Sequence, residues 1–342
     1  MMKLGTIGTS KIATDLAKGA LSTGLWELKA VYSRDKKRAE QFAEAFGGAD
    51  LYDDLERMAQ SDIDAVYIAS PNSLHYSQSK LFLEHGKHVF CEKPLTVMPW
   101  EAAGLAALAR SKGLVYLEAI VSMHQPWLNE ERDAIASIGN IGVARFDFCQ
   151  RSAGYDEFMA DGKVPTAYDP GFAAGCLMDV GVYCIYPAVE FFGEPKRTVT
   201  EASMLKNGAD GSVGGLLIYP QMQVIVSASK TGRGICGSEI IGDRGTVLIG
   251  RLHHMTDVKV VYHDKTTREI CRDPEKPVLM ANEITDFYNY IAYPEKYWKQ
   301  VNFYFNNSKS WISEKNIEKI KKAVEQNSVR TAFADCLLQK QL

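Results

Sequence analysis

The stretch "HVFCEKPLT" (88–96) puts an acid and a base where an apolar run ends. Glu92 and Lys93 follow a short run with strand character, and Pro94 constrains the backbone directly after them. A lysine held at the rim of a sheet can supply a positive charge or a proton to a reacting oxygen. The alternative is an ordinary surface loop, so the surrounding elements must decide between the two.

A second stretch, "GCLMDVGVY" (175–183), pairs a carboxylate with a phenol. Asp179 and Tyr183 are four residues apart and would share one face of a helix. An aspartate in so apolar a run needs a partner if it is buried. Tyrosine, with an ordinary pKa of about 10, acts as an acid or base at neutral pH only beside a cation. The pattern suits acid–base chemistry, and its alternative is a capping aspartate with a core tyrosine.

The turn "GTSKIA" (8–13) follows the first apolar run and opens a helical pattern. The pattern G-x-G-x-x-G/A between a strand and a helix is typical of dinucleotide binding, because the free N–H groups of the helix receive the pyrophosphate. Gly8 and Ala13 fit, and Ser10 replaces the second glycine with a hydroxyl that can donate to a phosphate. An ordinary tight turn is the alternative. The residues expected to contact the dinucleotide here are Gly8, Thr9, Ser10, Lys11 and Ile12.

The end of the second predicted strand bears on the choice of cofactor. An NAD site wants an acid there, about 20 residues past the glycines, to bind the ribose 2′-hydroxyl. The segment "VYSRDKKR" (31–38) instead has Ser33 and Arg34 at the tip, and Asp35 comes one step later. Arginine binds a 2′-phosphate through paired hydrogen bonds. The sequence therefore predicts NADP, with NAD as second choice, and contacts from Ser33, Arg34 and Arg38.

Alternating strands and helices must position these residues. Such alternation is typical of a parallel sheet covered on both faces, which is a Rossmann domain, and ligands bind there outside the carboxyl ends of the strands. We expect this α/β domain to span residues 1–120. The predicted strands are 3–9, 26–33, 65–71, 88–91 and 114–120, and the helices between them are 11–24, 35–47, 73–86 and 98–113.

The pattern changes after residue 120 to strands joined only by turns. It predicts an α+β second domain, 121–342, with a large, mostly antiparallel open sheet. An open sheet must cover its apolar face or edges, so we expect a homodimer, with a tetramer as the alternative. An amphipathic cover helix is predicted at 313–326. The predicted strands of this domain are 214–220, 222–230, 238–243, 245–250 and 257–264.

Composition bounds the remaining classes of function. The 342 residues carry a net charge of −3, which gives no basic patch for nucleic acid or an anionic membrane. No apolar run approaches the roughly 20 residues that span a bilayer, and the first ten residues do not read as a signal peptide. The seven cysteines include no C-x-x-C spacing. We therefore expect a cytoplasmic protein with free thiols and no metal.

Four stretches together resemble the glucose–fructose oxidoreductase / inositol dehydrogenase / rhizopine-catabolism superfamily of NAD(P)-dependent oxidoreductases. They follow the family's order and distances and span both predicted domains. The D-x-G-x-Y pattern is closest to the dihydrodiol dehydrogenase-like branch. The inositol dehydrogenase branch tends to carry histidine where Tyr183 stands, which argues against a polyol such as inositol as substrate. The four stretches are "GTSKIA" (8–13), "IASPNSLHY" (68–76), "CEKPL" (91–95) and "GCLMDVGVY" (175–183).

The resemblance implies cofactor contacts around the E-K-P triplet. In such enzymes this lysine points toward the nicotinamide ring, so Lys93 is expected there, with the Lys93–Pro94 bond cis. Glu92 would contact the cofactor or hold Lys93. His75 is either a cofactor contact or a structural histidine. The residues expected along the cofactor after the third predicted strand are Ser70, Pro71 and Asn72.

The resemblance also implies a reaction, namely hydride transfer between a nicotinamide and a hydroxyl or carbonyl group of a sugar, sugar derivative or cyclic diol. Tyr183 would be the general acid/base, Lys93 its electrostatic partner and Asp179 the orienting group, with direct proton transfer by Lys93 as the alternative. The competing class is a non-catalytic, NADP-sensing sugar regulator on the same fold, and the presence of all three residues favours the enzyme. The identity of the substrate and the direction of the reaction stay open.

Two further expectations concern the second domain. Segments 151–159 and 163–172 are predicted to form the specificity loop. Its aromatic residues, Tyr168 among them, would face a sugar ring or a flat hydrocarbon. His253 and His254 read as the surface of a hairpin rather than as metal ligands.

Overall fold

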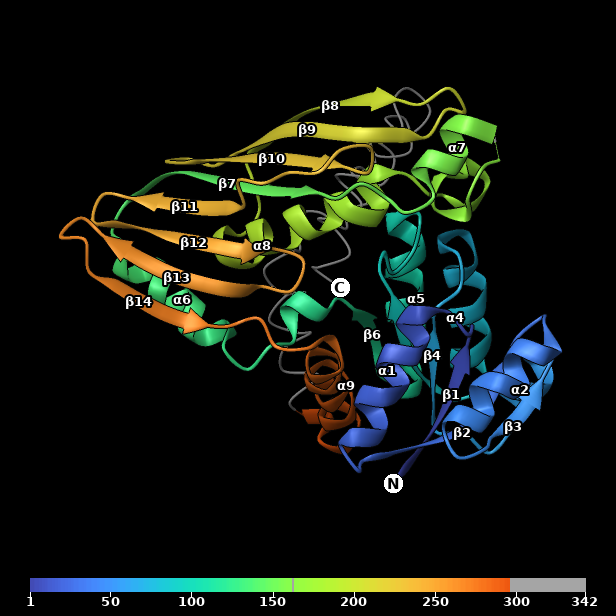
Figure 1. Ribbon diagram of the computed structural model, residues 1–342. Helices are drawn as coiled ribbons and strands as arrows, with labels where there is room; N and C mark the ends of the chain where they lie inside the picture. The colour runs from blue at the N-terminus through green and yellow to red at the C-terminus, as the bar shows by residue number, and fades with distance from the viewer. Residues whose placement is uncertain (162, 296–342) are drawn as a thin grey trace. The chain divides into compact units, whose positions relative to one another are not determined.

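The computed structural model describes residues 1–161 and 163–295, which form two compact units (Figure 1). Within the described ranges, the first unit contains Met1–Ile120 together with 275–295, and the second contains Val121–Pro274. Each unit is built around its own sheet.

The first unit holds a six-stranded parallel sheet in the order β3-β2-β1-β4-β5-β6. This is the Rossmann order, and the direction of winding reverses between β1 and β4. The predicted Rossmann domain is confirmed, and only the short strand β3 was not expected. The strands are β1 (Met2–Ile7), β2 (Trp26–Tyr32), β3 (Asp50–Tyr52), β4 (Ala65–Ile68), β5 (His88–Glu92) and β6 (Tyr116–Ala119).

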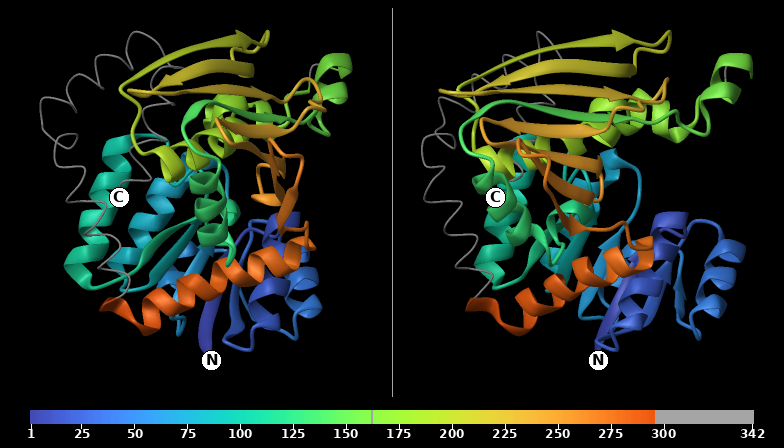
Figure 2. Two further views of the ribbon diagram at one scale, coloured as in Figure 1. Left: turned by 90° about the vertical axis from the view of Figure 1, so that its left-hand side faces the viewer. Right: turned by 60° about the vertical axis from the view of Figure 1, so that its left-hand side comes forward.

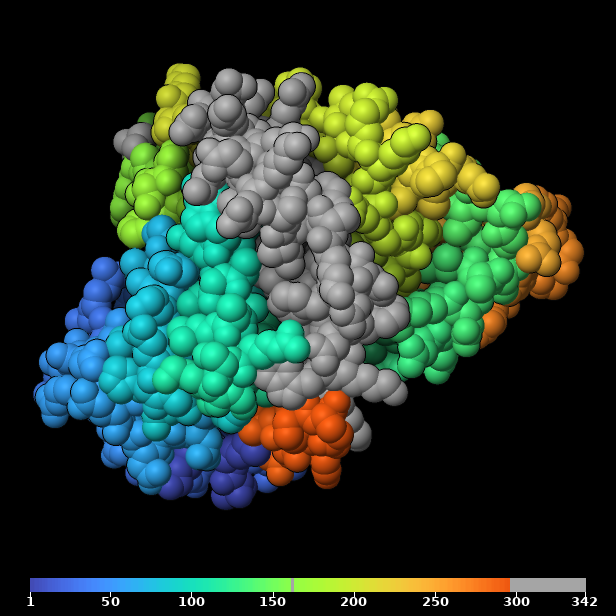
Figure 3. Space-filling model, turned by 180° about the vertical axis from the view of Figure 1, so that it is seen from behind, coloured from blue at the N-terminus to red at the C-terminus, as the bar shows by residue number. Residues whose placement is uncertain are grey.

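Helices cover both faces of this sheet, as the continuous apolar strands require. Buried side chains of α1, α2 and α9 form one apolar cluster against the strands, and those of α3, α4 and α5 form the other. Figure 3 shows the outer surface of the second layer in the light-blue to teal colours of residues 55–112. The helices are α1 (Lys11–Ser22), α2 (Lys36–Ala45), α3 (Leu55–Ala59), the short 3₁₀ segment η1 (Asn72–Leu74), α4 (His75–Glu84), α5 (Pro99–Lys112) and α9 (Lys276–Ala292).

Helix α9 departs from the sequence-based division of the chain, which placed everything after residue 120 in a second domain. It packs on α1 in the first unit. The ring of Phe287 stacks between Trp26, at 5.7 Å between centroids, and Phe90, at 4.9 Å. A Cβ on Gly19 of α1 would lie 2.8 Å from the backbone N of Ala281, so glycine permits this close approach. These contacts join distant parts of the chain, so no local pattern announces them.

The second unit is an eight-stranded sheet in the order β14-β13-β12-β11-β7-β10-β9-β8. Neighbouring strands are antiparallel except β7 and β10, so the predicted, mostly antiparallel sheet is confirmed. The expected strands correspond to β9–β13, whereas β7, β8 and β14 were missed. The strands are β7 (Ile141–Cys149), β8 (Arg197–Met204), β9 (Asp210–Ile218), β10 (Gln223–Ser229), β11 (Ser238–Gly242), β12 (Gly245–Arg251), β13 (Thr256–Tyr262) and β14 (Thr267–Cys271).

The helices of this unit that contact its strands lie on one face of the sheet (Figure 2). Strand β10 shows the consequence, because Val224 and Val226 are buried while Gln223 and Ile225 are exposed. The sheet therefore has one packed and one open face in the described part of the chain. The helical segments are η2 (Val121–Met123), α6 (Leu128–Ser137), α7 (Tyr155–Asp161), η3 (Thr166–Tyr168), η4 (Pro170–Phe172), the π-helical η5 (Leu177–Gly181) and α8 (Val182–Phe192).

Three further observations concern the described residues alone. No helix among them is long and apolar enough to cross a membrane. Their six cysteines are all free thiols. No group of three or more His, Cys, Asp or Glu side chains within these ranges is arranged to hold a metal ion. The predicted helix at 313–326 lies outside the described residues.

Candidate active site

The glycine turn sits where the winding of the parallel sheet reverses. Gly8 has a φ of +103°, and a Cβ there would lie 2.9 Å from the carbonyl oxygen of Ala69, just past β4. Its N–H donates to the Tyr32 carbonyl at 3.1 Å. Only glycine accommodates both the positive φ and the close approach. The carboxyl ends of β1, β2 and β4 are thereby drawn together, at the place where this fold binds ligands.

Helix α1 begins directly behind this turn. Ser10 is its N-cap residue in an extended conformation, and its hydroxyl makes no capping hydrogen bond. The first turn of α1 contains no acidic residue, and the ammonium of Lys11 pairs with Asp15 at 3.2 Å. The first N–H groups of a helix have no partner within it and carry partial positive charge. The arrangement can therefore receive a pyrophosphate beside Thr9, Ser10 and Ile12.

The tip of β2 carries the residues predicted to bind a 2′-phosphate. Asp35 is occupied as the N-cap of α2, accepting from the Arg38 N–H at 3.2 Å, and it also pairs with the Arg38 guanidinium at 3.6 Å. The Ser33 hydroxyl accepts from the Asp35 N–H at 3.1 Å. Arg34 is exposed and makes no hydrogen bond or ion pair with any residue the structure describes. Its guanidinium is thus available to an anionic ligand, whereas that of Arg38 is partly neutralised.

His75 links the end of β4 to the E-K-P turn. Its side chain is fully buried, with Nδ1 at 2.8 Å from the Pro94 carbonyl oxygen and Nε2 at 2.9 Å from the Ser70 carbonyl oxygen. Burial lowers the pKa of this imidazole. The placement favours the structural alternative for His75, since both ring nitrogens face backbone carbonyl groups. It holds Ser70, and with it the turn through Pro71 and Asn72, against Pro94.

The E-K-P turn is packed into the unit and is not a solvated loop. Lys93 is half-buried, and Pro94 and Leu95 are buried. The Lys93–Pro94 peptide bond is cis, as expected from the resemblance. Glu92 ends β5 and accepts a hydrogen bond from the Tyr67 hydroxyl at 2.5 Å. Burial raises the pKa of Glu92, and the adjacent Lys93 charge opposes that rise. The surface-loop alternative for this stretch is therefore wrong.

In the second unit Asp179 has a partner that the sequence-based reasoning missed. Asp179 lies in the π-helical η5, and its Oδ2 accepts from the Lys230 ammonium at 2.7 Å. Lys230 is only 1% exposed, although it directly follows strand β10. A buried ammonium requires an anion or several acceptors. The one signal in the sequence was a lysine at the end of the apolar run "VIVSASK", whose pairing strand sequence cannot identify.

Tyr183 lies in α8, four residues beyond Asp179, and is half-buried. Its ring meets Phe148 edge-on at 5.4 Å and His253 edge-on at 6.1 Å, and the latter two rings stack at 4.5 Å. His253 does sit in the turn between β12 and β13, but its side chain packs beside Tyr183. Both His253 and His254 are partly exposed in this turn, and the His254 side chain, which is 14% exposed, lies 3.8 Å from Asp273.

The predicted specificity loop needs one correction. Tyr168 is fully buried, its hydroxyl donates to the Lys230 carbonyl at 2.9 Å, and its ring stacks on Phe158 at 5.6 Å. It therefore belongs to the internal packing of segments 151–159 and 163–172. It does not face a substrate.

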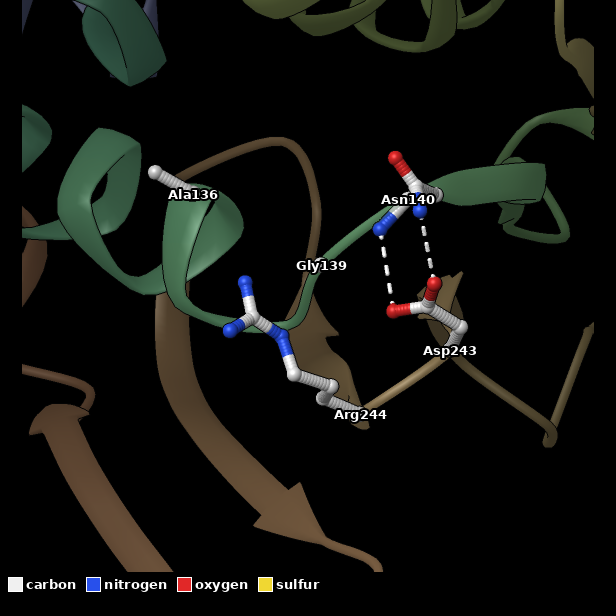
Figure 4. A pocket seen from close by; sticks show the side chains of 5 residues that line it. All are labelled: Ala136, Gly139, Asn140, Asp243 and Arg244. Atoms are coloured by element: carbon white, nitrogen blue, oxygen red, sulfur yellow. Dashed lines mark hydrogen bonds between the residues drawn. The ribbon is translucent and has the colours of Figure 1, made fainter.

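A shallow depression elsewhere on the second unit is lined by polar residues (Figure 4). The Asp243 carboxylate there accepts from the Asn140 N–H at 3.1 Å and from its side-chain amide at 2.8 Å. A Cβ on Gly139 would collide with the same carboxylate. The depression lies where two turns are joined by hydrogen bonds, and both carboxylate oxygens of Asp243 already accept hydrogen bonds from Asn140.

Two groups of residues thus emerge. In the first unit, the predicted cofactor residues lie at the carboxyl ends of β1, β2, β4 and β5. The second unit gathers Asp179 and Tyr183 with Lys230 and His253. A Rossmann unit with this edge, joined in one chain to a large open sheet, is the architecture of a nucleotide-binding protein.

Comparison with known proteins gives the family. Residues 2–120 match the model of the "Oxidoreductase family, NAD-binding Rossmann fold". The scyllo-inositol 2-dehydrogenase (NADP⁺) of Bacillus subtilis is 37% identical over 280 residues, which are 82% of this chain and 85% of that protein. The chain therefore belongs to the glucose–fructose oxidoreductase / inositol dehydrogenase / rhizopine-catabolism family and is an oxidoreductase, as its motifs predicted.

Other relatives broaden the comparison. The trans-1,2-dihydrobenzene-1,2-diol dehydrogenase of Mus musculus is 32% identical over 226 residues, 64% of this chain and 65% of that one. A 3-ketoreductase from Actinomadura kijaniata, solved in complex with NADP and TDP-benzene, superimposes with a TM-score of 0.74 at 25% identity, covering 85% of this chain and 90% of that one. The family's fold thus extends over both units.

Proposed function

We propose that the chain is an NADP-dependent dehydrogenase or reductase that acts on a hydroxyl or carbonyl carbon of a cyclic polyol, sugar derivative or diol. The observation that carries the proposal is the E-K-P turn. It is packed and anchored, and it presents Lys93 at the carboxyl end of β5 in the same sheet as the glycine turn. Ligands of Rossmann sheets bind along this edge.

The preference for NADP rests on the tip of β2. The Arg34 guanidinium makes no hydrogen bond or ion pair with any described residue, and Asp35, the acid nearest to it in sequence, is occupied as a helix cap. The Bacillus subtilis relative is named as an NADP⁺ enzyme, and the Actinomadura kijaniata ketoreductase was solved with NADP. Both relatives support the same choice, and NAD remains the second choice.

The chemistry divides between cofactor and protein. The nicotinamide, when bound, supplies or accepts the hydride. In the reducing direction Tyr183 donates a proton to the oxygen on which negative charge develops, and in the oxidising direction it takes that proton. Lys93 supplies a positive charge for the reaction, and Asp179 orients the reacting group. Direct proton transfer by Lys93 is the alternative assignment.

The substrate class is drawn from the relatives and from the groups around Tyr183. The inositol dehydrogenase is 37% identical to this chain and the diol dehydrogenase 32%, which supports a polyol as a substrate class beside a diol. The aromatic rings of Phe148 and His253 lie beside Tyr183, and aromatic side chains are suited to contact with the C–H groups of a ring substrate.

Cofactor binding and a substrate panel test the proposal. Quenching of tryptophan fluorescence gives the Kd for NADPH and for NADH. Absorbance at 340 nm then follows NADP⁺ reduction with scyllo-inositol, D-xylose and trans-dihydrobenzenediol. We expect at least tenfold tighter binding of NADPH and turnover of at least one ring substrate. Binding of NADPH with no turnover would favour the NADP-sensing regulator, and binding of neither dinucleotide would overturn the proposal.

We further propose that the open face of the second unit's sheet pairs two copies of the chain. Ile225 and Val199 are exposed on it, at 36% and 43%. Light scattering at micromolar concentration should give a dimer mass, and Ile225→Glu should halve it, whereas Met159→Glu on α7 should not. A monomeric mass for the unaltered protein would contradict this. The cytoplasmic location inferred from the free thiols stays a prediction.

A further inference from the structure

We propose that Lys230 is a positioning residue that fixes the carboxylate of Asp179 and ties it to the segment 163–172. The inference rests on the proposed function, in which Asp179 orients the reacting group. Lys230 does not belong to any motif of the sequence, and it has no role in the acid–base scheme above.

The ammonium of Lys230 is enclosed by acceptors. Its Nζ donates to Asp179 Oδ2 at 2.7 Å and to the Ala167 carbonyl at 2.5 Å, and it lies 4.6 Å from the centroid of the Tyr168 ring. The side chain is 1% exposed. A charge removed from water so completely is tolerated only when its partners compensate for the lost hydration. Asp179 is the one anion among these contacts, so the ion pair stabilises the ionised form of the Asp179 carboxyl group.

The backbone of Lys230 joins the same parts of the unit. Its N–H donates to the Gly211 carbonyl at 2.9 Å, at the start of β9. Its carbonyl oxygen accepts from the Ser152 N–H and from the Tyr168 hydroxyl, each at 2.9 Å. One residue therefore holds Asp179, segment 151–159 and segment 163–172 at fixed positions relative to β10. A shift of any of them would break at least one of these bonds.

The exposure of the two partners separates their roles. The Asp179 side chain is 38% exposed, so it can meet a ligand, whereas the buried Lys230 cannot. Lys230 therefore acts through Asp179. A carboxylate next to a cation stays ionised at lower pH than one without. The loss of Lys230 should leave Asp179 both less firmly oriented and ionised only at higher pH.

The decisive variant is Lys230→Met, which keeps an unbranched side chain one atom shorter and removes the charge. With scyllo-inositol and NADP⁺ as the probe reaction, we expect kcat to fall 10- to 100-fold, and the acid limb of the kcat–pH profile to move up by a pH unit or more. The Kd for NADPH should change less than twofold. Lys230→Arg keeps the charge and should keep the acid limb in place. Lys196→Met, an exposed lysine of the same unit, should match the unaltered protein.

A second measurement needs no turnover and so separates this inference from the proposed function. Asp179→Asn leaves the Lys230 ammonium buried without its anion, so it should lower the melting temperature more than the double variant Lys230→Met/Asp179→Asn does. The inference is overturned if the decrease in melting temperature of the double variant equals the sum of the decreases of the two single variants. It is equally overturned if Lys230→Met retains full kcat and an unchanged acid limb. Absence of turnover of all three substrates of the panel by the unaltered protein, with the thermal coupling intact, would refute the proposed function alone.

Discussion

At the scale of single residues, the residues on both sides of Lys93 are hydrogen-bonded to three different elements, β4, α4 and β6. Tyr67 of β4 bonds the Glu92 side chain, His75 of α4 bonds the Pro94 carbonyl, and Glu118 of β6 accepts from the Leu95 N–H at 2.9 Å. A reactive side chain gains precision when its supporting shell is rigid. The turn therefore restricts where the Lys93 ammonium can go, even though lysine itself has a flexible side chain.

The first prediction concerns the two proposed acid–base residues. Lys93→Met removes a charge and Tyr183→Phe removes a hydroxyl, while the phenylalanine ring still packs on Phe148 and His253. We expect each variant to lose at least 100-fold in kcat, because the developing charge on the substrate oxygen loses its proton or its counter-charge. The Kd for NADPH should stay within a few-fold. Initial rates at saturating cofactor measure the effect, and near-normal turnover in both variants would refute these roles.

The second prediction concerns the cofactor's 2′-phosphate. Arg34→Ala should raise the Kd for NADPH at least tenfold, about 1.4 kcal/mol, and leave the Kd for NADH nearly unchanged. Lys37→Ala provides a matched control, because Lys37 is another exposed cation of the same segment. Fluorescence titration with both dinucleotides measures the six constants of the unaltered protein and the two variants. Equal losses for NADPH and NADH would place Arg34 away from the 2′-phosphate.

The residues that belong to a local sequence motif could be found from the sequence. The residues that contact them from distant parts of the chain could not. Gly8 and Lys93 stand in local patterns, since a turn and a strand end are each decided within a few residues. Lys230 and His253 reach their places through strand pairings and turns that are distant in sequence from Asp179 and Tyr183. Their role depends on which strands are neighbours, and that is a property of the whole sheet.

At the scale of elements, α9 contributes to the core of the first unit, although more than a hundred residues separate it from Ile120, where the unit's first segment ends. Phe287 is fully buried between Trp26 and Phe90. Sequence reasoning found most strands of both sheets, because their apolar runs are bounded by turns. It missed β7, although this strand lies at the centre of the second sheet, where it pairs in parallel with β10. Non-local pairing of this kind leaves little trace in the strand itself.

The third prediction tests the contribution of α9. Phe287→Ala should destabilise the first unit by about 3–5 kcal/mol, the usual cost of removing a buried aromatic ring. Val278→Ala on the same helix is the control, since Val278 is 51% exposed and should cost much less. Urea unfolding followed by tryptophan fluorescence measures both values, with Trp26 itself as a reporter of the site. Equal stability of the two variants would show that α9 adds little to this core.

At the scale of the whole molecule, stability should depend on pH through buried carboxyl groups. Glu131 of α6 is 1% exposed, and neither of its carboxyl oxygens has a hydrogen-bond partner among the described residues. Burial raises the pKa of Glu131 from 4.5 to about 8, and the charge of Arg132 only partly opposes the rise. The folded state therefore favours the protonated form. The stability that the raised pKa of Glu131 adds to the folded state is fully present below pH 4.5 and is lost as the pH rises toward 8.

The fourth prediction follows from this sign. Between pH 5.5 and 7.5 the free energy of unfolding should fall by about 1.4 kcal/mol per pH unit through this one group. Glu131→Gln, which cannot ionise, should remove that part of the slope, and Glu130→Gln, at an exposed neighbour, should not. Urea midpoints at the two pH values measure the difference. An identical slope in the unaltered protein and in Glu131→Gln would show that the carboxyl ionises freely in the fold.

The placement of α9 also has a consequence for biosynthesis. The ribosome releases the six strands of the nucleotide-binding unit first, then the entire second sheet, and only afterwards the helix that covers Trp26 and Phe90. Domains generally fold in the order in which they emerge. Here the first domain to emerge still lacks α9 when the whole second sheet has been made, so the nascent chain must carry an uncovered aromatic surface through the synthesis of some 150 residues.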